Sequence, residues 1–137
     1  MPQLNLVRLV RLWRKPMKID IIQAGDTNIA VVFSEKPVIV DVQSALDLIL
    51  SVSYQTDVRR IVINKEAMGD EFFILSTGLA GEILQKFINY QVKVAMYGDY
   101  SRYTSKPLKD FIYESNRGKN IFFTGTKEEA IDKLKEK

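Results

Sequence analysis

The 137-residue sequence contains neither cysteine nor histidine. Lack of cysteine excludes disulfide bonds and thiol catalysis, and lack of histidine excludes Ser-His-Asp triads and imidazole acid–base chemistry. Their joint absence also excludes the usual zinc sites, so no metal site is predicted. An enzyme built from this chain would have to use carboxylates, lysine, tyrosine, serine or a bound cofactor.

Acidic side chains are missing from the first 16 residues, which hold Arg8, Arg11, Arg14 and Lys15. The whole chain has 20 basic and 17 acidic residues, so the remaining 121 residues carry 16 basic and 17 acidic ones. The net charge of +3 therefore comes from this leader. A nucleic-acid-binding domain needs a basic face, and these counts support none, so no nucleic-acid partner is expected.

Residues 1–16 form a short basic amphipathic stretch that Pro16 ends. Arginines interrupt its apolar run, so it fits neither a transmembrane helix nor the core of a signal peptide. We interpret it as an upstream extension of a single α/β domain at 17–137, with Met17 as an alternative start; the extension is disordered or docks on the domain. Attachment to a membrane surface is the other interpretation. The expected location is cytoplasmic, consistent with the lack of cysteine.

Short β-branched runs alternate with helical patterns along the rest of the chain. The strands are predicted at 17–24, 29–33, 59–64, 92–97 and 121–124, with a short extended bridge at 38–40. The helices are predicted after Asp41, from Thr77-Gly78 to about Tyr90, at 105–116 and at 127–135. This order predicts an α/β fold with four helices and a mainly parallel sheet that has an antiparallel strand at one edge.

Ligands of open α/β sheets lie beyond the carboxyl ends of the parallel strands. In this sequence those ends are followed by 65–70, 98–106 and 124–126, and the middle loop has the richest chemistry. The predicted ligand- or partner-binding residues are Asp99, Tyr100, Arg102, Tyr103, Ser105, Lys106 and Glu66.

Two kinds of side chain in the loop suit binding. Arg102 and Lys106, beside a helix N-terminus, could hold a phosphate or carboxylate, and Tyr100 and Tyr103 could stack on a base or a partner surface. The alternative is a solvated loop whose tyrosines cover the sheet edge and whose Ser105 caps the next helix.

Two further groups of residues have a functional and a structural interpretation. Ser76 and Thr77 stand at a predicted helix start, where a phosphate would be stabilised, or where Thr77 is simply the cap. The charged group of Lys65, Glu66, Asp70 and Glu71 could supply paired carboxylates or bind Mg²⁺ with Asp99, or it could lie on a solvated loop. Neither GxGxxG nor GxxxxGK[ST] occurs, so no cofactor is predicted.

Three phrases carry a family resemblance: DVQSALDL at 41–48, FFILSTGLAGEILQKFINY at 72–90 and GDYSRYTSKPLKDFIYESNRGKN at 98–120. They resemble the bacterial family catalogued as domain of unknown function 4180, over about residues 17–135. This resemblance implies no activity.

The order of elements also resembles that of STAS domains, the fold of bacterial anti-sigma-factor antagonists. In that family a Ser-Ser-Gly-Leu-Gly-like phrase begins a helix and a partner kinase phosphorylates its first serine. The phrase here is Ser76-Thr77-Gly78-Leu79-Ala80, so the resemblance implies a phosphosite at Ser76. Leu75 replaces the acidic residue that usually precedes this serine, and the segment before the helix is longer.

The sequence therefore favours a regulatory or interaction domain of STAS-like fold. Its partner would be a protein, a small anionic ligand or a second copy of the chain. The alternative is a small cytoplasmic enzyme acting on a phosphorylated or carboxylated metabolite, with carboxylates at 66, 70 or 99 and Lys106. Fold alone does not choose between the two.

Overall fold

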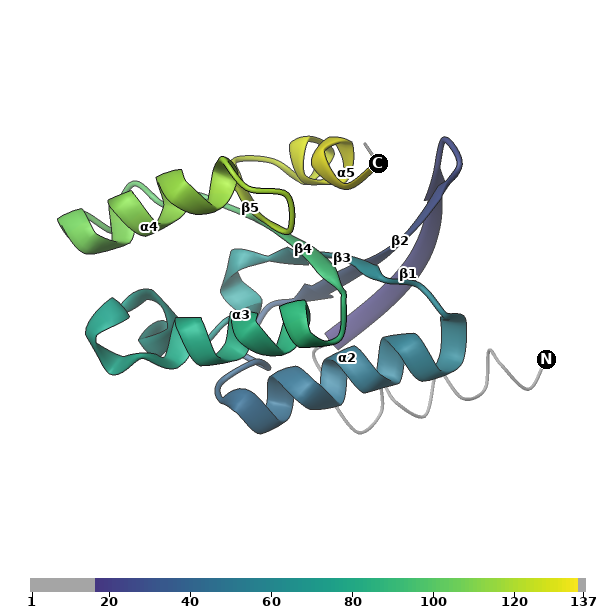
Figure 1. The fold of residues 1–137 in the computed structure, drawn as a ribbon, viewed down its shortest axis with the longest axis horizontal. Coiled ribbons are helices and arrows are strands. Elements are labelled where there is room, and N and C mark those ends of the chain that lie inside the picture. Colours follow the sequence, from purple (N-terminus) through teal and green to yellow (C-terminus); the bar gives the residue numbers. More distant parts are fainter. Residues whose placement is uncertain (1–16, 136–137) are drawn as a thin grey trace.

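A computed structural model describes residues 17–135. The predicted leader at 1–16 lies outside the described residues, so its interpretations stay predictions. The strands are β1 (Met17–Ala24), β2 (Thr27–Ser34), β3 (Arg60–Asn64), β4 (Lys93–Tyr97) and β5 (Ile121–Thr124). The α-helices are α2 (Val42–Thr56), α3 (Leu79–Asn89), α4 (Lys106–Asn116) and α5 (Lys127–Lys135). The predicted order of strands and helices is confirmed (Figure 1).

The five strands form one sheet in the order β1-β2-β3-β4-β5. β1 and β2 pair antiparallel over their full length, whereas β2, β3, β4 and β5 pair in parallel. The sheet is thus mixed, which corrects the expectation of a mainly parallel one. The difference arises because the hairpin around Gly25, whose φ of 65° suits a tight turn, joins two full-length strands of eight residues each.

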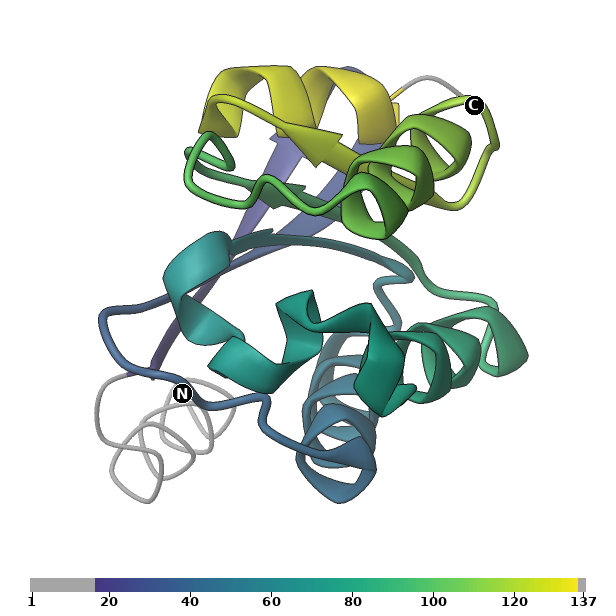
Figure 2. The ribbon, with the colours of Figure 1, turned by 90° about the vertical axis from the view of Figure 1, so that its left-hand side faces the viewer.

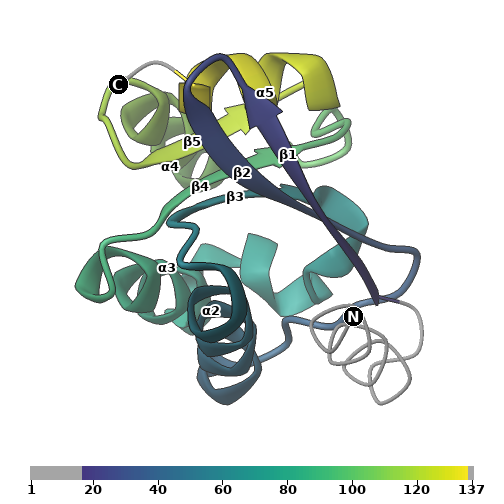
Figure 3. The same cartoon turned by 90° about the vertical axis from the view of Figure 1, so that its right-hand side faces the viewer.

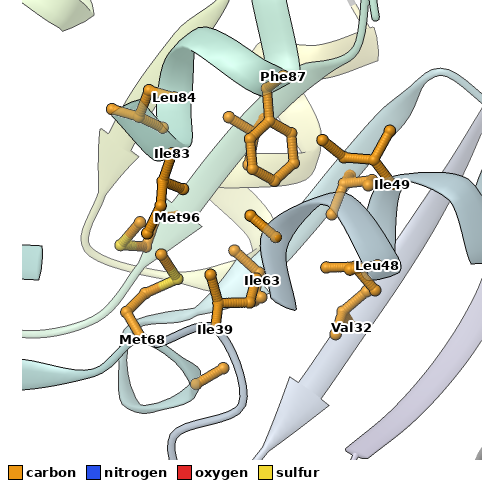
Figure 4. Close-up of a cluster of buried hydrophobic side chains, with 14 of the residues drawn as sticks. Val32, Ile39, Leu48, Ile49, Ile63, Met68, Ile83, Leu84, Phe87 and Met96 are labelled. Carbon is orange, nitrogen blue, oxygen red and sulfur yellow. The ribbon is translucent and has the colours of Figure 1, made fainter. Parts of the chain in front are cut away.

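Helices cover the two faces of the sheet unequally. α2 and α3 lie together on one side of the strands and α5 lies on the other (Figures 2 and 3). The larger core lies under α2, α3 and Leu108 of α4, and it is filled by side chains such as Ile49, Ile63 and Phe87 (Figure 4). The smaller core lies under α5, whose Ala130 and Leu134 are fully buried.

Local capping explains where three helices begin. Ser44 N–H donates to Asp41 Oδ1 at 2.8 Å before α2, and Leu108 N–H donates to Ser105 Oγ at 3.3 Å at the start of α4. Thr126 and Glu129 form a reciprocal capping box at α5. These three starts are confirmed.

The segment between β3 and α3 differs from the expected charged loop. It folds into three short 3₁₀ turns, η1 (Lys65–Ala67), η2 (Asp70–Phe73) and η3 (Leu75–Thr77). Ala67, Met68 and Phe72 within it are buried, so the segment belongs to the core. The predicted bridge at 38–40 is reduced to one isolated pairing of Ile39 with Met68.

Candidate anion-binding site at the carboxyl edge of the sheet

The ends of β3, β4 and β5 meet in register. Asn64 lies opposite Tyr97, and Tyr97 lies opposite Thr124. The next residues, Lys65 and Gly98, pack directly against each other, because a Cβ built on Gly98 would lie 2.7 Å from Lys65 Cβ. The lysine stem therefore runs over a position where only glycine leaves room.

Lys65 is the buried cation of this edge. The residue is 9% exposed, and its ammonium lies 5.3 Å from the centre of the Tyr103 ring. Its nearest carboxylate oxygen is Glu66 Oε2 at 4.0 Å, too far for a hydrogen bond. Lys65 was named in the charged group after β3 but was not among the predicted ligand- or partner-binding residues. Its position directly after a buried β-branched strand is the signal that could have identified it.

Tyr103 is the centre of the site. Its ring stacks on Phe73 of η2, with centroids 4.7 Å apart and an interplanar angle of 21°. The guanidinium of Arg102 lies 5.2 Å from the same ring centre, so two cations lie within about 5.3 Å of one aromatic ring centre. The structure thus brings Arg102 and Tyr103 together with Lys65.

Glu66 is held beside Lys65 by Asn64. The Asn64 amide donates to Glu66 Oε1 at 3.2 Å and to the Ser34 carbonyl at 2.7 Å. Asn64 Oδ1 accepts from Ser34 N–H at 2.9 Å. The Glu66 side chain remains 55% exposed, so its carboxylate lies at the mouth of the site.

Asp99 and Tyr100 have local partners. Asp99 Oδ1 accepts from Ser101 N–H at 2.9 Å, and hydrogen bonds from Ser101 hold the Asp99 pKa below its usual value of 3.8, with a smaller effect from Lys65. Tyr100 donates its hydroxyl to the Met96 carbonyl at 3.0 Å, and its ring contacts Phe123 edge-on. Burial and then the charge of Glu66 raise the Tyr100 pKa. Tyr100 therefore packs in the apolar layer beside Phe73, on which the Tyr103 ring stacks.

Ser105 and Lys106 are engaged within α4. Ser105 is the helix cap, and the Lys106 ammonium donates to Asp110 Oδ2 at 2.8 Å along the same helix. Their predicted part in ligand binding is not tested by this arrangement, but their polar groups already have partners.

Ser76 and Thr77 lie on η3, ahead of α3. Thr77 Oγ1 donates to the Ile74 carbonyl at 2.9 Å and accepts from Leu79 N–H at 3.2 Å. The cap residue of α3 is Gly78, with φ of 78°, so the helix begins later than predicted. Both side chains are exposed, and the phosphosite stays a prediction.

The acidic residues of this region do not gather. Asp70 and Glu71 lie in the first turn of η2, and within residues 17–135 no three carboxylates converge to hold a metal ion. The arrangement of these described residues gives the Mg²⁺ interpretation no geometric support.

Two open grooves lie outside the predicted residues. One, of about 640 Å³, lies beside Val42 of α2 and Glu82 of α3. The other, of about 580 Å³, is lined by Leu50, Tyr54 and Tyr90 near the amino ends of β3 and β4. Sequence reasoning missed both, because each combines residues distant in the chain.

The fold and the site define an α/β domain with a mixed five-stranded sheet, four described helices and a cationic, aromatic edge. None of the helices described between residues 17 and 135 has the length and apolar character needed to cross a bilayer. The chain belongs to the family described as domain of unknown function (DUF4180), which it matches over residues 24–134. This confirms the resemblance seen in the sequence. No curated protein matches the chain.

Proposed function

We propose that this domain binds a small anionic ligand, through a phosphate or carboxylate group, at the edge formed by Lys65, Arg102 and Tyr103. The observation that carries the proposal is the Lys65 side chain, which is only 11% exposed and whose ammonium has, among residues 17–135, a 4.0 Å carboxylate contact and an aromatic ring but no hydrogen-bond acceptor. A charge whose side chain is mostly withdrawn from water gains from a close hydrogen-bond acceptor, and an incoming anion would supply one.

The neighbouring residues suit an anion that carries further polar groups. Arg102 adds a forked donor at the same ring, and the exposed Glu66 carboxylate can accept from a ligand hydroxyl or amine. Glu66 also disfavours an anion that brings no such donor. A phosphorylated or carboxylated metabolite with hydroxyl or amino groups fits this combination. A small enzyme would hold the same group in the same place, and our proposal is binding without turnover.

The experiment is an amide-resolved NMR titration of the full chain with inorganic phosphate and, separately, glycerol phosphate. Sodium chloride at equal ionic strength is the blank. We expect saturable shifts at Lys65, Arg102 and Tyr103, stronger for glycerol phosphate. Lys65→Met retains the apolar stem, and Arg102→Gln changes an exposed residue. Each should weaken binding about tenfold, or ~1.4 kcal/mol.

Lys109→Gln is the matched control, because it removes an exposed α4 cation and should leave the affinity unchanged. Equal affinity of Lys65→Met, Arg102→Gln and the wild type would overturn the proposal. So would shifts that do not saturate or that the chloride blank reproduces.

The STAS-like interpretation adds a regulatory form of this proposal, in which phosphorylation of Ser76 changes ligand binding. Its support is the exposed position of Ser76, three residues beyond Phe73, the ring on which Tyr103 stacks. The same titration with Ser76→Asp tests it. A changed affinity, with Ser76→Asn behaving as wild type, supports the regulatory form, and an unchanged affinity contradicts it.

A further inference from the structure

The two edge strands of the sheet, β5 and β1, differ in whether their outward backbone groups have hydrogen-bond partners. At β5, the Asn116 side chain donates to the Phe123 carbonyl at 3.1 Å and accepts from Phe123 N–H at 2.7 Å, so these edge groups are already satisfied. At the opposite edge, β1 is eight residues long and pairs only with β2 among residues 17–135. An unpaired edge strand is a template for a further strand.

The alternation of the strands shows which groups of β1 face outward. The backbone N–H and carbonyl of Ser34 both bond the Asn64 side chain of β3. Backbone groups alternate along a strand, so those of the neighbouring Phe33 face β1. Phe33 lies opposite Lys18, and Val31, two residues earlier, lies opposite Asp20. The backbone groups of Lys18 and Asp20 are therefore used inside the sheet. Those that face outward belong to Met17, Ile19, Ile21 and Gln23.

We propose that β1 is a homodimer interface, at which a second copy of the chain adds its own β1 antiparallel, with the two-fold axis at Ile19. The two five-stranded sheets then join into one. In this register Ile19 pairs with the partner's Ile19, and Met17 pairs with the partner's Ile21. Ile19 and Ile21 have no outward backbone partner among residues 17–135, whereas Met17 is 2% exposed and would have to be uncovered before it could pair.

Charge selects this register over its neighbours. With the axis at Ile19, Lys18 lies opposite the partner's Asp20 at a non-hydrogen-bonded pair, where side chains approach most closely. Symmetry repeats the contact, which gives two ion pairs. Moving the axis to Asp20 places it opposite the partner's Asp20, and moving it to Ile21 leaves both charges without an opposite partner. Opposite charges favour cross-strand pairing, and like charges oppose it.

The other face of the pair is apolar. Met17, Ile19 and Ile21 alternate with the charged residues, so they share one face of β1. Ile21 is 44% exposed, and Ile19 packs only partly against the larger core. Met17 is already 2% exposed within its own core, so pairing would chiefly cover Ile19 and Ile21. Charges on an edge strand commonly discourage association, but here their spacing is self-complementary.

The first test is sedimentation equilibrium of the full chain from micromolar to millimolar concentration. We expect self-association to twice the monomer mass of 15.7 kDa. Lys18→Glu or Asp20→Lys alone should weaken the dimer at least tenfold, because each places like charges opposite each other. The double variant Lys18→Glu/Asp20→Lys should restore it. A monomeric wild type, or single variants that dimerise as well as the wild type, overturns the proposal.

The second test uses the absence of native cysteine. In the proposed register the Cα atoms of Ile19 and the partner's Ile19 are about 5.5 Å apart, within disulfide reach. Ile19→Cys should therefore give a covalent dimer on mild oxidation. Gln23→Cys is the matched control, because its sulfurs would lie roughly 26 Å apart along the strands. Equal cross-linking of the two variants, or none with Ile19→Cys, overturns the register.

Discussion

At the scale of single residues, the contact between Gly98 and Lys65 fixes the geometry of the candidate site. Gly98 has φ of 155°, at the end of β4, and its missing side chain makes room for the lysine stem. The position of the Lys65 ammonium over Tyr103 therefore depends on a residue with no side chain.

Gly98→Ala should lower the free energy of unfolding by about 1–3 kcal/mol, because the new Cβ would lie 2.7 Å from Lys65 Cβ. It should also weaken phosphate binding, since the lysine stem must move. Urea unfolding followed by circular dichroism measures the change. Gly81→Ala, in α3, is the control: no atom lies within 4 Å of its Cβ, so it should be stabilising by about 0.5–1 kcal/mol. A neutral Gly98→Ala variant would contradict the packing argument.

Local sequence could not reveal this contact, because the two residues are 33 positions apart. A lysine followed by Glu66, Asp70 and Glu71 is typical of a solvated segment. Arg102 and Tyr103 were predicted from their place at a strand end, which follows from topology alone. Lys65 was named only within the charged group after β3 and not as a binding residue, because lysine is rarely buried and its stem packs against Gly98, which follows another strand.

At the scale of elements, the Asn64 side chain extends the pairing of β2 and β3. Backbone pairing of these strands covers Ala30 to Val32, and the Asn64 amide then takes both polar groups of buried Ser34. The Asn64 side chain thus makes the two hydrogen bonds that a further backbone residue of β3 would make, at the point where β3 ends and η1 begins.

Asn64→Leu should lower the free energy of unfolding by about 2–4 kcal/mol, because it leaves the buried N–H and carbonyl of Ser34 without partners. Chemical denaturation measures this loss. Hydrogen exchange should show faster exchange of the Ser34 amide in the variant. Gln43→Leu, which removes an exposed contact with Asp47, is the control and should change stability by less than about 0.5 kcal/mol. Protection of the Ser34 amide in Asn64→Leu would show that this account is wrong.

Elements with their own capping signals were predicted well. The Thr126–Glu129 box and Ser105 followed by Pro107 identify the starts of α5 and α4 from residues within one turn. The turns η1, η2 and η3 have no such signal. They form because tertiary packing buries Phe72 and Phe73, and 3₁₀ turns satisfy the backbone over short stretches.

At the scale of the whole molecule, the pKa shifts predict a dependence of stability on pH. Hydrogen bonds from Ser44 hold the pKa of Asp41 below 3.8, and Ser101 does the same for Asp99. A lowered folded-state pKa contributes stability that is present above the unfolded value and is lost as pH falls through the folded value. We therefore expect a melting temperature that is steady from about pH 5 upward and falls below about pH 4.

Asp41→Asn separates this titration from capping, because asparagine is also a good helix cap. The variant should match the wild type at pH 7 and lose less stability between pH 5 and pH 3. Differential scanning calorimetry across this range makes the comparison. A parallel acid profile in both proteins would mean that Asp41 is not among the groups responsible.

Among residues 17–135, α5 is the helix that covers the second face of the sheet, and it also governs the order in which the molecule can be completed during translation. Ile29, Val31 and Val62 are covered by Ala130 and Leu134 of α5, which follows every strand in the chain. β2 and β3, which carry these residues, leave the ribosome before α5 is made, so they present an apolar surface until α5 emerges. A chain truncated between β5 and α5 would keep this surface open. The helix α5 is thus the last described element to be synthesised and the one that covers the smaller core.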